Sequence, residues 1–494
     1  MGLLKAKNID ATTGSLFKKI ILYSLPLMLS TLIQQLFNAV DIMVLGNMAN
    51  STAVASVAAT SSITSLIVTA FVGIATGTRV VLARFIGAKD EKNARQVTDT
   101  SLIFAVVIGA VIAVVGFILA PWFLDITECP PECYEGALIY VRIYVSAAPF
   151  ILLYNFGSSV ITADGDTQRP LYYIMIAGAV NVVLNIILCF MLDNETVSFI
   201  LNGVSHLPGV GLDGETIKYL SSTLDQKVVA VAVATVASQV IGAVLVSFRL
   251  LTMDGICRVK IQKMCFGFSA LGKVLAAGLP MALVHALFPL SNLQIQSAIN
   301  SYGVTATAGN GAASTIETVV SAFPSPFGTA AAVFIGQNIG AKKPDRVRKS
   351  FWYCMIMTTA VAVVVGVGTY LTGRFWLSLI VGSDAEAIEF GLVRMSCTTL
   401  FYFVAAINGV FASAILAHGF SVASAINSVF SVFVFRIIWM QVLYPHNKTF
   451  LFVMACFVVS WGVRMLANFV IYGSIWHGYK KKTDLLTVLS EEQK

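Results

Sequence analysis

A single carboxylate, Asp41, lies in an otherwise apolar stretch near the start of this 494-residue chain. Gln34 and Asn38 precede it by seven and three positions, so a helix would carry all three side chains on one face. A charged side chain inside an apolar span costs roughly 2.5 to 3.5 kcal/mol on insertion scales, and such residues usually have a function. Beside amide oxygens, a carboxylate can exchange a proton or hold Na+. We therefore predict that Asp41 takes up a proton or binds Na+.

Further polar side chains lie in other apolar stretches of the first half. Asn181 and Asn185 are four residues apart, so both point the same way from one helix. Asn155 and Thr235 lie at comparable depth in neighbouring stretches. For each of these four residues, hydrogen bonding between helices is the simpler interpretation. That interpretation suits Asp41 least, because packing does not require a bare carboxylate.

The second half has its own polar residues. His285, Asn292 and Gln296 form a stripe that could line a cavity, although His285 could also be a purely structural residue. Three ionisable residues accompany the stripe: Glu317, Arg436 and Arg464. Glu317 could form an ion pair with either arginine. The five histidines show no metal-binding spacing, so the sequence does not indicate a metalloenzyme, and we expect no enzyme activity and no cofactor.

The polar residues lie within long apolar stretches. Apolar residues make up 57% of the chain and charged residues only 12%, against about 25% charged in a typical soluble domain, and the mean hydropathy is +0.83. Twelve stretches reach the roughly 20 residues of a spanning helix. They lie near 20–46, 52–77, 94–120, 135–163, 168–192, 227–250, 269–299, 305–336, 350–372, 387–417, 419–443 and 449–475. We predict an all-α, multi-pass membrane protein with twelve spans.

The distribution of basic residues predicts the orientation in the lipid bilayer. Of the 32 Lys and Arg residues, 24 fall in the N-terminus, in alternate loops or in the C-terminal tail. Cytoplasmic segments carry such an excess, so both termini are predicted to be cytoplasmic, in a cell membrane. Segment 125–135, on the opposite side, contains three Glu, one Asp and no basic residue. The net charge of +7 therefore reflects topology and does not indicate a nucleic-acid partner.

An internal repeat divides the chain. Ile86-Gly87-Ala88-Lys89 recurs 253 positions later as Ile339-Gly340-Ala341-Lys342, and at the same offset Arg95 matches Arg348. Six spans per copy is an even number, so both copies insert in the same direction, related by a pseudo-two-fold axis along the membrane normal. We expect an N-lobe at 1–250, a cytoplasmic linker at 251–268, and a C-lobe with a cytoplasmic tail at 269–494.

The two copies differ in their polar residues. Asp41 corresponds to Gln294 at the offset of 253, and Asn181 and Asn185 correspond to Val434 and Ile438. This asymmetry is expected if only the N-lobe binds the coupling ion. Pro26 lies within the first span, where its missing backbone donor weakens the helix and permits a bend. Pro324 and Pro326 interrupt the eighth span.

The outer loops leave two questions open. The loop at 193–226 is much longer than its counterpart at 444–448, and it can be a cap or a tolerated insertion. Cys129 and Cys133 lie in another outer loop, where they can form a disulfide or stay as two free thiols.

These motifs resemble the multidrug and toxic compound extrusion (MATE) family of antiporters over nearly the whole chain. The likeness rests on Leu25-Pro26 followed by Asp41, on Ile86-Gly87-Ala88-Lys89 after the second span, and on Gly336-Gln337-Asn338-Ile339-Gly340-Ala341 after the eighth. The resemblance implies two six-helix lobes that open alternately inward and outward. It also implies export of organic cations and other amphipathic toxins against an inflow of H+ or Na+.

The resemblance places the N-lobe ion site on Asp41, Asn155, Asn181, Asn185 and Thr235. The DinF-like branch often has a second Asp where this chain has Asn185, which puts chelation of Na+ by two carboxylates in doubt. The acidic residues of the NorM-like branch are also missing, because the seventh span has His285 and the tenth has no carboxylate between Phe390 and Ala417. The DinF-like branch is therefore the closer match.

Export of amphipathic, cationic small molecules by one chain acting as a monomer is the function that these observations favour. The alternative is a flippase for a lipid-linked oligosaccharide or another lipid-like substrate. A flippase cavity would need several cations for the pyrophosphate, whereas the deep cations identified in the sequence are Arg436 and Arg464. The sequence does not choose between H+ and Na+.

Overall fold

The computed structural model describes residues 8–48, 51–127, 129–191 and 226–492. The long predicted outer loop at 193–226 lies outside these residues except for its last position. The side chains of Asn38 and Asp41 also lie outside the described part, although the helical backbone that carries them is described. The described chain is all helical, as predicted.

The first half of the chain contributes seven described helices. They are α1 (Leu16–Met48), α2 (Ser51–Gly87), α3 (Glu91–Ile126), α4 (Pro131–Ser146), α5 (Ala148–Ala163), α6 (Gln168–Met191) and α9 (Gln226–Thr252). A linker with one 3-10 turn, η1 (Ile261–Lys263), leads to the second half. Cys129 and Cys133, before and within α4, are free thiols.

The second half contains ten α-helices and irregular turns. They are α10 (Phe268–Asn300), α11 (Val304–Ser321), α12 (Ser325–Gly340), α13 (Pro344–Leu371), α14 (Gly373–Val381), α15 (Ala385–Cys397), α16 (Tyr402–Ala417), α17 (Ser421–Ser428), α18 (Phe435–Ile438) and α19 (Phe450–Glu492). Two π-helical segments, η2 (Val429–Val434) and η3 (Trp439–Leu443), flank α18, and a 3-10 turn, η4 (Tyr444–His446), follows.

Membrane spans can be counted from helix length and apolar composition. Ten helices of the described chain are long and apolar enough to cross a membrane, and the number rises to twelve if each of two bent pairs is one span. The pairs are α4 with α5, bent by 47°, and α15 with α16, bent by 43°. The predicted break in the eighth span is also present, because residues 322–324 separate α11 from α12.

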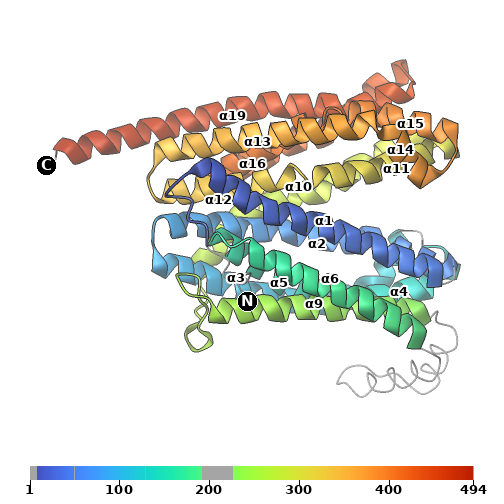
Figure 1. The fold of residues 1–494 in the computed structure, drawn as a ribbon, viewed down its shortest axis with the longest axis horizontal. Helices are drawn as coiled ribbons and strands as arrows, with labels where there is room; N and C mark the ends of the chain where they lie inside the picture. Colours follow the sequence, from blue (N-terminus) through green and yellow to red (C-terminus); the bar gives the residue numbers. More distant parts are fainter. Residues whose placement is uncertain (1–7, 49–50, 128, 192–225, 493–494) are drawn as a thin grey trace.

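The helices form two bundles that lie side by side. Figure 1 shows the second half, yellow to red, above the first half, blue to green, with α1, α2, α10 and α12 between them. One buried cluster crosses the boundary, since Ile20 and Tyr23 of α1 pack with Phe334 of α12. The rings of Tyr23 and Phe334 meet edge to face with centroids 5.5 Å apart.

The second and eighth spans are longer than their apolar stretches suggest. The spans near 52–77 and 305–336 continue as helix to Gly87 and Gly340, so both repeated glycines end a helix instead of following one. The reason is tertiary, because the added turns are covered by the opposite bundle. The turns that follow are alike, since Lys89 and Lys342 both have a left-handed φ of 55°. We call the face where α2 and α12 end, and where α1 begins, the terminal face.

Candidate functional site

The repeated glycines form a contact between the bundles at the terminal face. A Cβ atom at Gly87 of α2 would lie 1.9 Å from the carbonyl oxygen of Gln337 on α12. A Cβ atom at Gly340 of α12 would lie 2.0 Å from the carbonyl oxygen of Arg84 on α2. The two contacts are equivalent under the 253-residue repeat, so α2 and α12 cross about the pseudo-two-fold axis. No side chain fits in this crossing, which explains the two glycines.

A second close approach joins α2 to α10. A Cβ atom at Gly73 would lie 2.6 Å from the Cα atom of Ala282, and one at Gly77 would lie 2.6 Å from the carbonyl oxygen of Val274. Gly278 on α10 approaches Ile74 at the same distance. Small residues on both helices therefore let the two backbones touch over about two turns.

The segment before α1 connects the two bundles. The backbone N–H of Ala11 donates to Oε1 of Gln337 at 3.0 Å, and the carbonyl oxygen of Ala11 accepts from Nδ2 of Asn338 at 3.1 Å. Gln337 also donates from Nε2 to the carbonyl oxygen of Ala163, at the end of α5, at 2.8 Å. Ala11 is fully buried. Gln337 is thus a bridge between α12, the N-terminal segment and α5.

Two arginines extend this connection. Arg84 of α2 donates to the carbonyl oxygens of Ala417 and Leu416, at the end of α16, at 2.8 and 3.0 Å. Arg346 of α13 donates to the carbonyl oxygen of Ala11 at 2.9 Å. The hydrogen bonds that can be described between the two bundles gather at the terminal face. The two bundles are closed against each other there.

A titratable group also lies at the terminal face, in the loop between α5 and α6. Burial and the neighbouring charge of Asp166 raise the pKa of Asp164 to about 7, while Arg249 opposes the rise. Asn8 donates from Nδ2 to Oδ2 of Asp164 at 2.5 Å, and the backbone N–H of Ile9 donates to the carbonyl oxygen of Gly165. This carboxyl group therefore lies beside the segment that joins the bundles.

The predicted ion site of the first half lies where α1 approaches α6. A Cβ atom at Gly178 of α6 would lie 1.9 Å from the ring of Phe37 on α1. One turn further along the two helices come Asp41 on α1 and Asn181 on α6. Asn181 and Asn185 are buried, and Asn185 donates from Nδ2 to Oδ1 of Asn181 at 3.2 Å. The two asparagines therefore share one face of α6, as the sequence predicted.

The other predicted residues of the first half make local contacts. Asn155 donates from Nδ2 to the carbonyl oxygen of Ile151 at 2.8 Å, and Thr235 donates to that of Val231, also at 2.8 Å. Both bonds stay within one helix, on α5 and α9, so neither requires a bound ion. Gln34 is exposed, and Pro26 is buried in an α1 helix that continues through it.

In the second half, the stripe on α10 joins a network of arginines. Asn292 accepts from Nη1 of Arg436 at 3.0 Å, and Nε of Arg436 donates to Oγ of Ser460 on α19 at 3.2 Å. Gln296 accepts from Nδ2 of Asn310 at 3.4 Å. His285, at the start of the stripe, is half-buried. The stripe therefore faces α11, α18 and α19.

Glu317 pairs with Arg394, an arginine that the sequence analysis did not single out. Nη2 of Arg394 on α15 lies 2.8 Å from Oε2 of Glu317 on α11, and Nη1 donates to Oδ1 of Asn310 at 2.7 Å. The suggested pairing of Glu317 with Arg436 or Arg464 is therefore wrong. The sequence carries the signal for this pair, because Arg394 is a charged residue within the apolar stretch 387–417.

A family model described as MatE matches residues 26–191 and 280–440, which include most of both bundles. The chain is 25% identical over 430 residues to the Probable multidrug resistance protein YpnP of Bacillus subtilis (strain 168), which is 87% of this chain and 89% of that protein. It is also 25% identical over 335 residues to the Probable multidrug resistance protein YoeA of the same strain, 68% of this chain and 67% of that protein.

A solved structure shows the same fold. It is described as the outward-facing conformation of a multidrug resistance MATE family transporter of the MOP superfamily. The two structures superpose with a TM-score of 0.80 at 18% sequence identity, over 97% of this chain and 99% of the other.

Proposed function

Because the chain belongs to the MatE family of membrane transporters, we propose that it is an antiporter that exports amphipathic small molecules, cationic ones among them, in exchange for H+ or Na+. It is a transporter and not an enzyme. The relatives YpnP and YoeA are both named as probable multidrug resistance proteins, which favours a transporter that accepts several substrates instead of one. We further propose that one chain acts as a monomer in the cell membrane, with both termini in the cytoplasm.

The observation that carries ion coupling is the approach of α1 to α6. The contact between Phe37 and Gly178 brings the two helices together one turn before Asp41 and Asn181. A membrane carboxylate next to buried amides can exchange a proton or hold Na+, and it is a functional candidate by default. We assign Asp41 the central role, with Asn181 and Asn185 next to it, and Asn155 and Thr235 in the surrounding helices.

Alternating access is supported by the closure at the terminal face. If that face is cytoplasmic, as the basic loops indicate, the described state is closed to the cytoplasm. Opening it requires the glycine contacts of α2 with α10 and α12 to separate. Pro26 lies in α1 without a backbone donor, so a bend there could link the ion state of Asp41 to this separation. The DinF-like assignment stays a prediction that rests on His285 in the seventh span and on the tenth span, which has no carboxylate between Phe390 and Ala417.

Efflux from proteoliposomes tests this function. The full-length protein should expel ethidium when a pH gradient or a Na+ gradient is imposed, and the gradient that drives efflux identifies the coupling ion. We expect Asp41→Asn to reduce coupled efflux at least about 100-fold, because the amide cannot take up a proton and lacks the negative charge that attracts Na+. A matched control is Asp125→Asn, an exposed carboxylate at the end of α3. Full efflux by the folded Asp41→Asn protein would disprove the mechanism.

A further inference from the structure

Two arginines inside the second bundle form no ion pair with any carboxylate that the structure describes. Arg436 of α18 is 3% exposed and Arg464 of α19 is half-buried, yet among the described side chains neither forms an ion pair. The third deep arginine, Arg394, is neutralised by Glu317. Arginines in membrane spans are rare and normally pair with an acid or with backbone carbonyls. This pair therefore requires an explanation.

Neutral groups hold Arg436 in a fixed position. Its Nε donates to Ser460 and its Nη1 to Asn292, and its guanidinium lies 4.5 Å from the ring centroid of Phe457. The π-helical segments η2 and η3 flank the single α-helical turn that carries it. Such segments often occur at functional sites. Arg436 bonds to described side chains through Nε and Nη1, the latter also reaching Oγ of Ser291 at 3.5 Å. A guanidinium has five N–H donors, so those of Nη2 stay available.

Arg464 lies one helical turn from Ser460, the α19 partner of Arg436. Ser460, which accepts the hydrogen bond from Arg436, is four residues before Arg464 on α19, so the two residues share one face of that helix. Nε of Arg464 is buried and has no hydrogen-bond partner among the described residues. Its guanidinium lies 5.8 Å from the ring centroid of Phe288. Two guanidinium groups in a low-dielectric interior repel strongly unless an anion lies between them.

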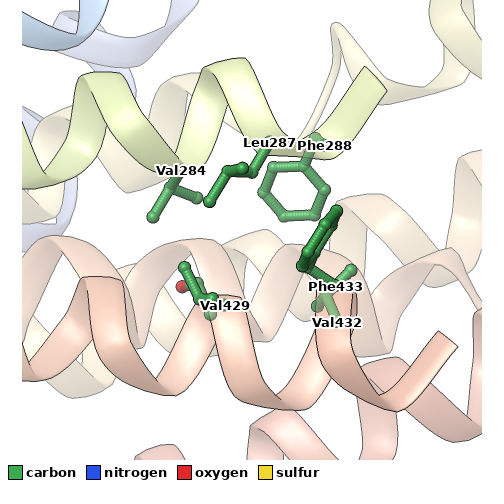
Figure 2. A pocket seen from close by; sticks show the side chains of 7 residues that line it. Val284, Leu287, Phe288, Val429, Val432 and Phe433 are labelled. Carbon is green, nitrogen blue, oxygen red and sulfur yellow. The ribbon is translucent and has the colours of Figure 1, made fainter. Parts of the chain in front are cut away.

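An apolar hollow adjoins this pair. Figure 2 shows Val284, Leu287 and Phe288 of α10 facing Val429, Val432 and Phe433 across the hollow, which is small and partly open to the outside. Phe288 contributes to both places, because it lines the hollow and also lies under Arg464. A cationic site and an apolar surface thus meet at one aromatic ring.

We propose that the second bundle binds the anionic group of an amphipathic molecule, a carboxylate or a phosphate, between Arg436 and Arg464, with the apolar part of that molecule against Phe288. Guanidinium groups suit these anions, because their planar N–H donors match two oxygens at once. Asn292 is exposed and bonded to Arg436, so it marks the open side of the site. The role of the bound anion as a substrate rests on the export function proposed above.

The position within the fold fits a substrate site. At the offset of 253, Arg436 corresponds to Val183 on α6, between Asn181 and Asn185. Val183 is exposed, whereas Asn181 and Asn185 are buried on another face of α6, because residues two positions apart do not share a helix face. The two proposed sites therefore lie on repeat-related helices but on different faces of them. Substrates that carry an acidic group would use the second bundle while the coupling ion occupies the first. A lipid headgroup and a soluble aromatic acid share this chemistry, and the experiment separates them.

Binding by the full-length protein in phosphatidylcholine nanodiscs tests the proposal. Isothermal titration calorimetry compares 2-naphthoate with its neutral analogue 2-naphthylmethanol, after subtraction of empty nanodiscs. We expect the wild type to bind 2-naphthoate at least about tenfold more tightly than the alcohol, as charge-assisted hydrogen bonds would give. Arg464→Gln should remove this difference and Arg464→Lys should restore part of it. Arg374→Gln, at an exposed arginine, should leave it unchanged.

Several outcomes would overturn the anion site. The proposal fails if the wild type binds the acid and the alcohol with equal affinity. It also fails if a folded Arg464→Gln protein binds 2-naphthoate as tightly as the wild type does. If that variant does not fold, competition by inorganic phosphate against 2-naphthoate in the wild type decides, and its absence rejects the site. Phosphatidylglycerol added to the nanodiscs tells the two ligand sources apart. If it weakens naphthoate binding, the site accepts a lipid headgroup, and if it does not, the site is specific for a soluble acid. Naphthoate binding is measured at equilibrium without an ion gradient, so a wild type that fails to export ethidium can still pass or fail this test.

Discussion

The backbone of Gly87 touches the carbonyl group of Gln337, and 253 residues later Gly340 touches that of Arg84 in the same way. A methyl group at either glycine would lie within about 2 Å of a backbone oxygen. Rotation of a side chain cannot relieve this clash, because the atom in contact belongs to the backbone. The two repeats therefore touch each other through the same sequence motif. This crossing is the tightest described contact between the bundles at the terminal face.

Gly87→Ala should open the terminal face. Overpacking a tight contact typically costs about 1 to 3 kcal/mol, and here separation of α2 from α12 relieves it. Distance measurements between spin labels at Lys92 and Lys349, both exposed, should show a longer mean distance in the variant. Gly368→Ala is the matched control, because nothing lies within 4 Å of its added Cβ atom. An unchanged distance distribution in Gly87→Ala would contradict the proposed crossing.

Gln337→Ala should loosen the N-terminal segment. The substitution removes the hydrogen bonds to Ala11 and Ala163, each worth about 0.5 to 1.5 kcal/mol, and leaves their buried backbone groups unsatisfied. Hydrogen exchange measured by mass spectrometry should therefore become faster at residues 9–13. The exposed Gln262→Ala variant serves as control. Equal protection in both variants would show that Gln337 does not hold the segment.

Asp164 should make the stability of the terminal face depend on pH. Its pKa is raised in the folded protein to about 7, from 3.8, so folding favours the protonated form. The stabilisation from protonation is complete below about pH 4 and is lost as the pH rises towards and through 7. The melting temperature of the wild type should fall between pH 5 and pH 8 more than that of Asp164→Asn. Asp345→Asn, at an exposed site, should behave like the wild type, and parallel curves for all three would refute the prediction.

Glu317→Gln should destabilise the second bundle strongly. The change leaves the charge of Arg394 buried without its acid, and breaking one side of a buried pair typically costs about 3 to 5 kcal/mol. The ion pair between Arg374 and Glu389 offers a control, because its side chains are 74% and 59% exposed and exposed pairs contribute little. Glu389→Gln should therefore melt close to the wild type. Thermal unfolding in detergent measures both, and similar melting temperatures would contradict the role of the Glu317 pair.

Much of the architecture follows from the sequence because the signals are local. A run of about 20 apolar residues forms a spanning helix whatever its neighbours are, and this predicted the all-helical fold. The interruption of the eighth span was predicted by Pro324 and Pro326, because proline cannot continue the hydrogen bonding of a helix. The 253-residue repeat predicted two equivalent bundles. The same reasoning singled out Asp41, since a charge in an apolar span is visible in one dimension.

Contacts between distant segments were decided by the tertiary structure alone. The sequence marked Glu317 as ionisable, but its partner is Arg394, 77 residues away, because the packing of α11 on α15 sets which charges meet. The sequence showed that Gly87 and Gly340 repeat, whereas only the crossing of α2 with α12 shows that they must be small. Likewise, the approach of Arg436 to Arg464 depends on how α18 packs on α19. Hydropathy and periodicity act along one helix, and the partner of each face is chosen by packing in three dimensions.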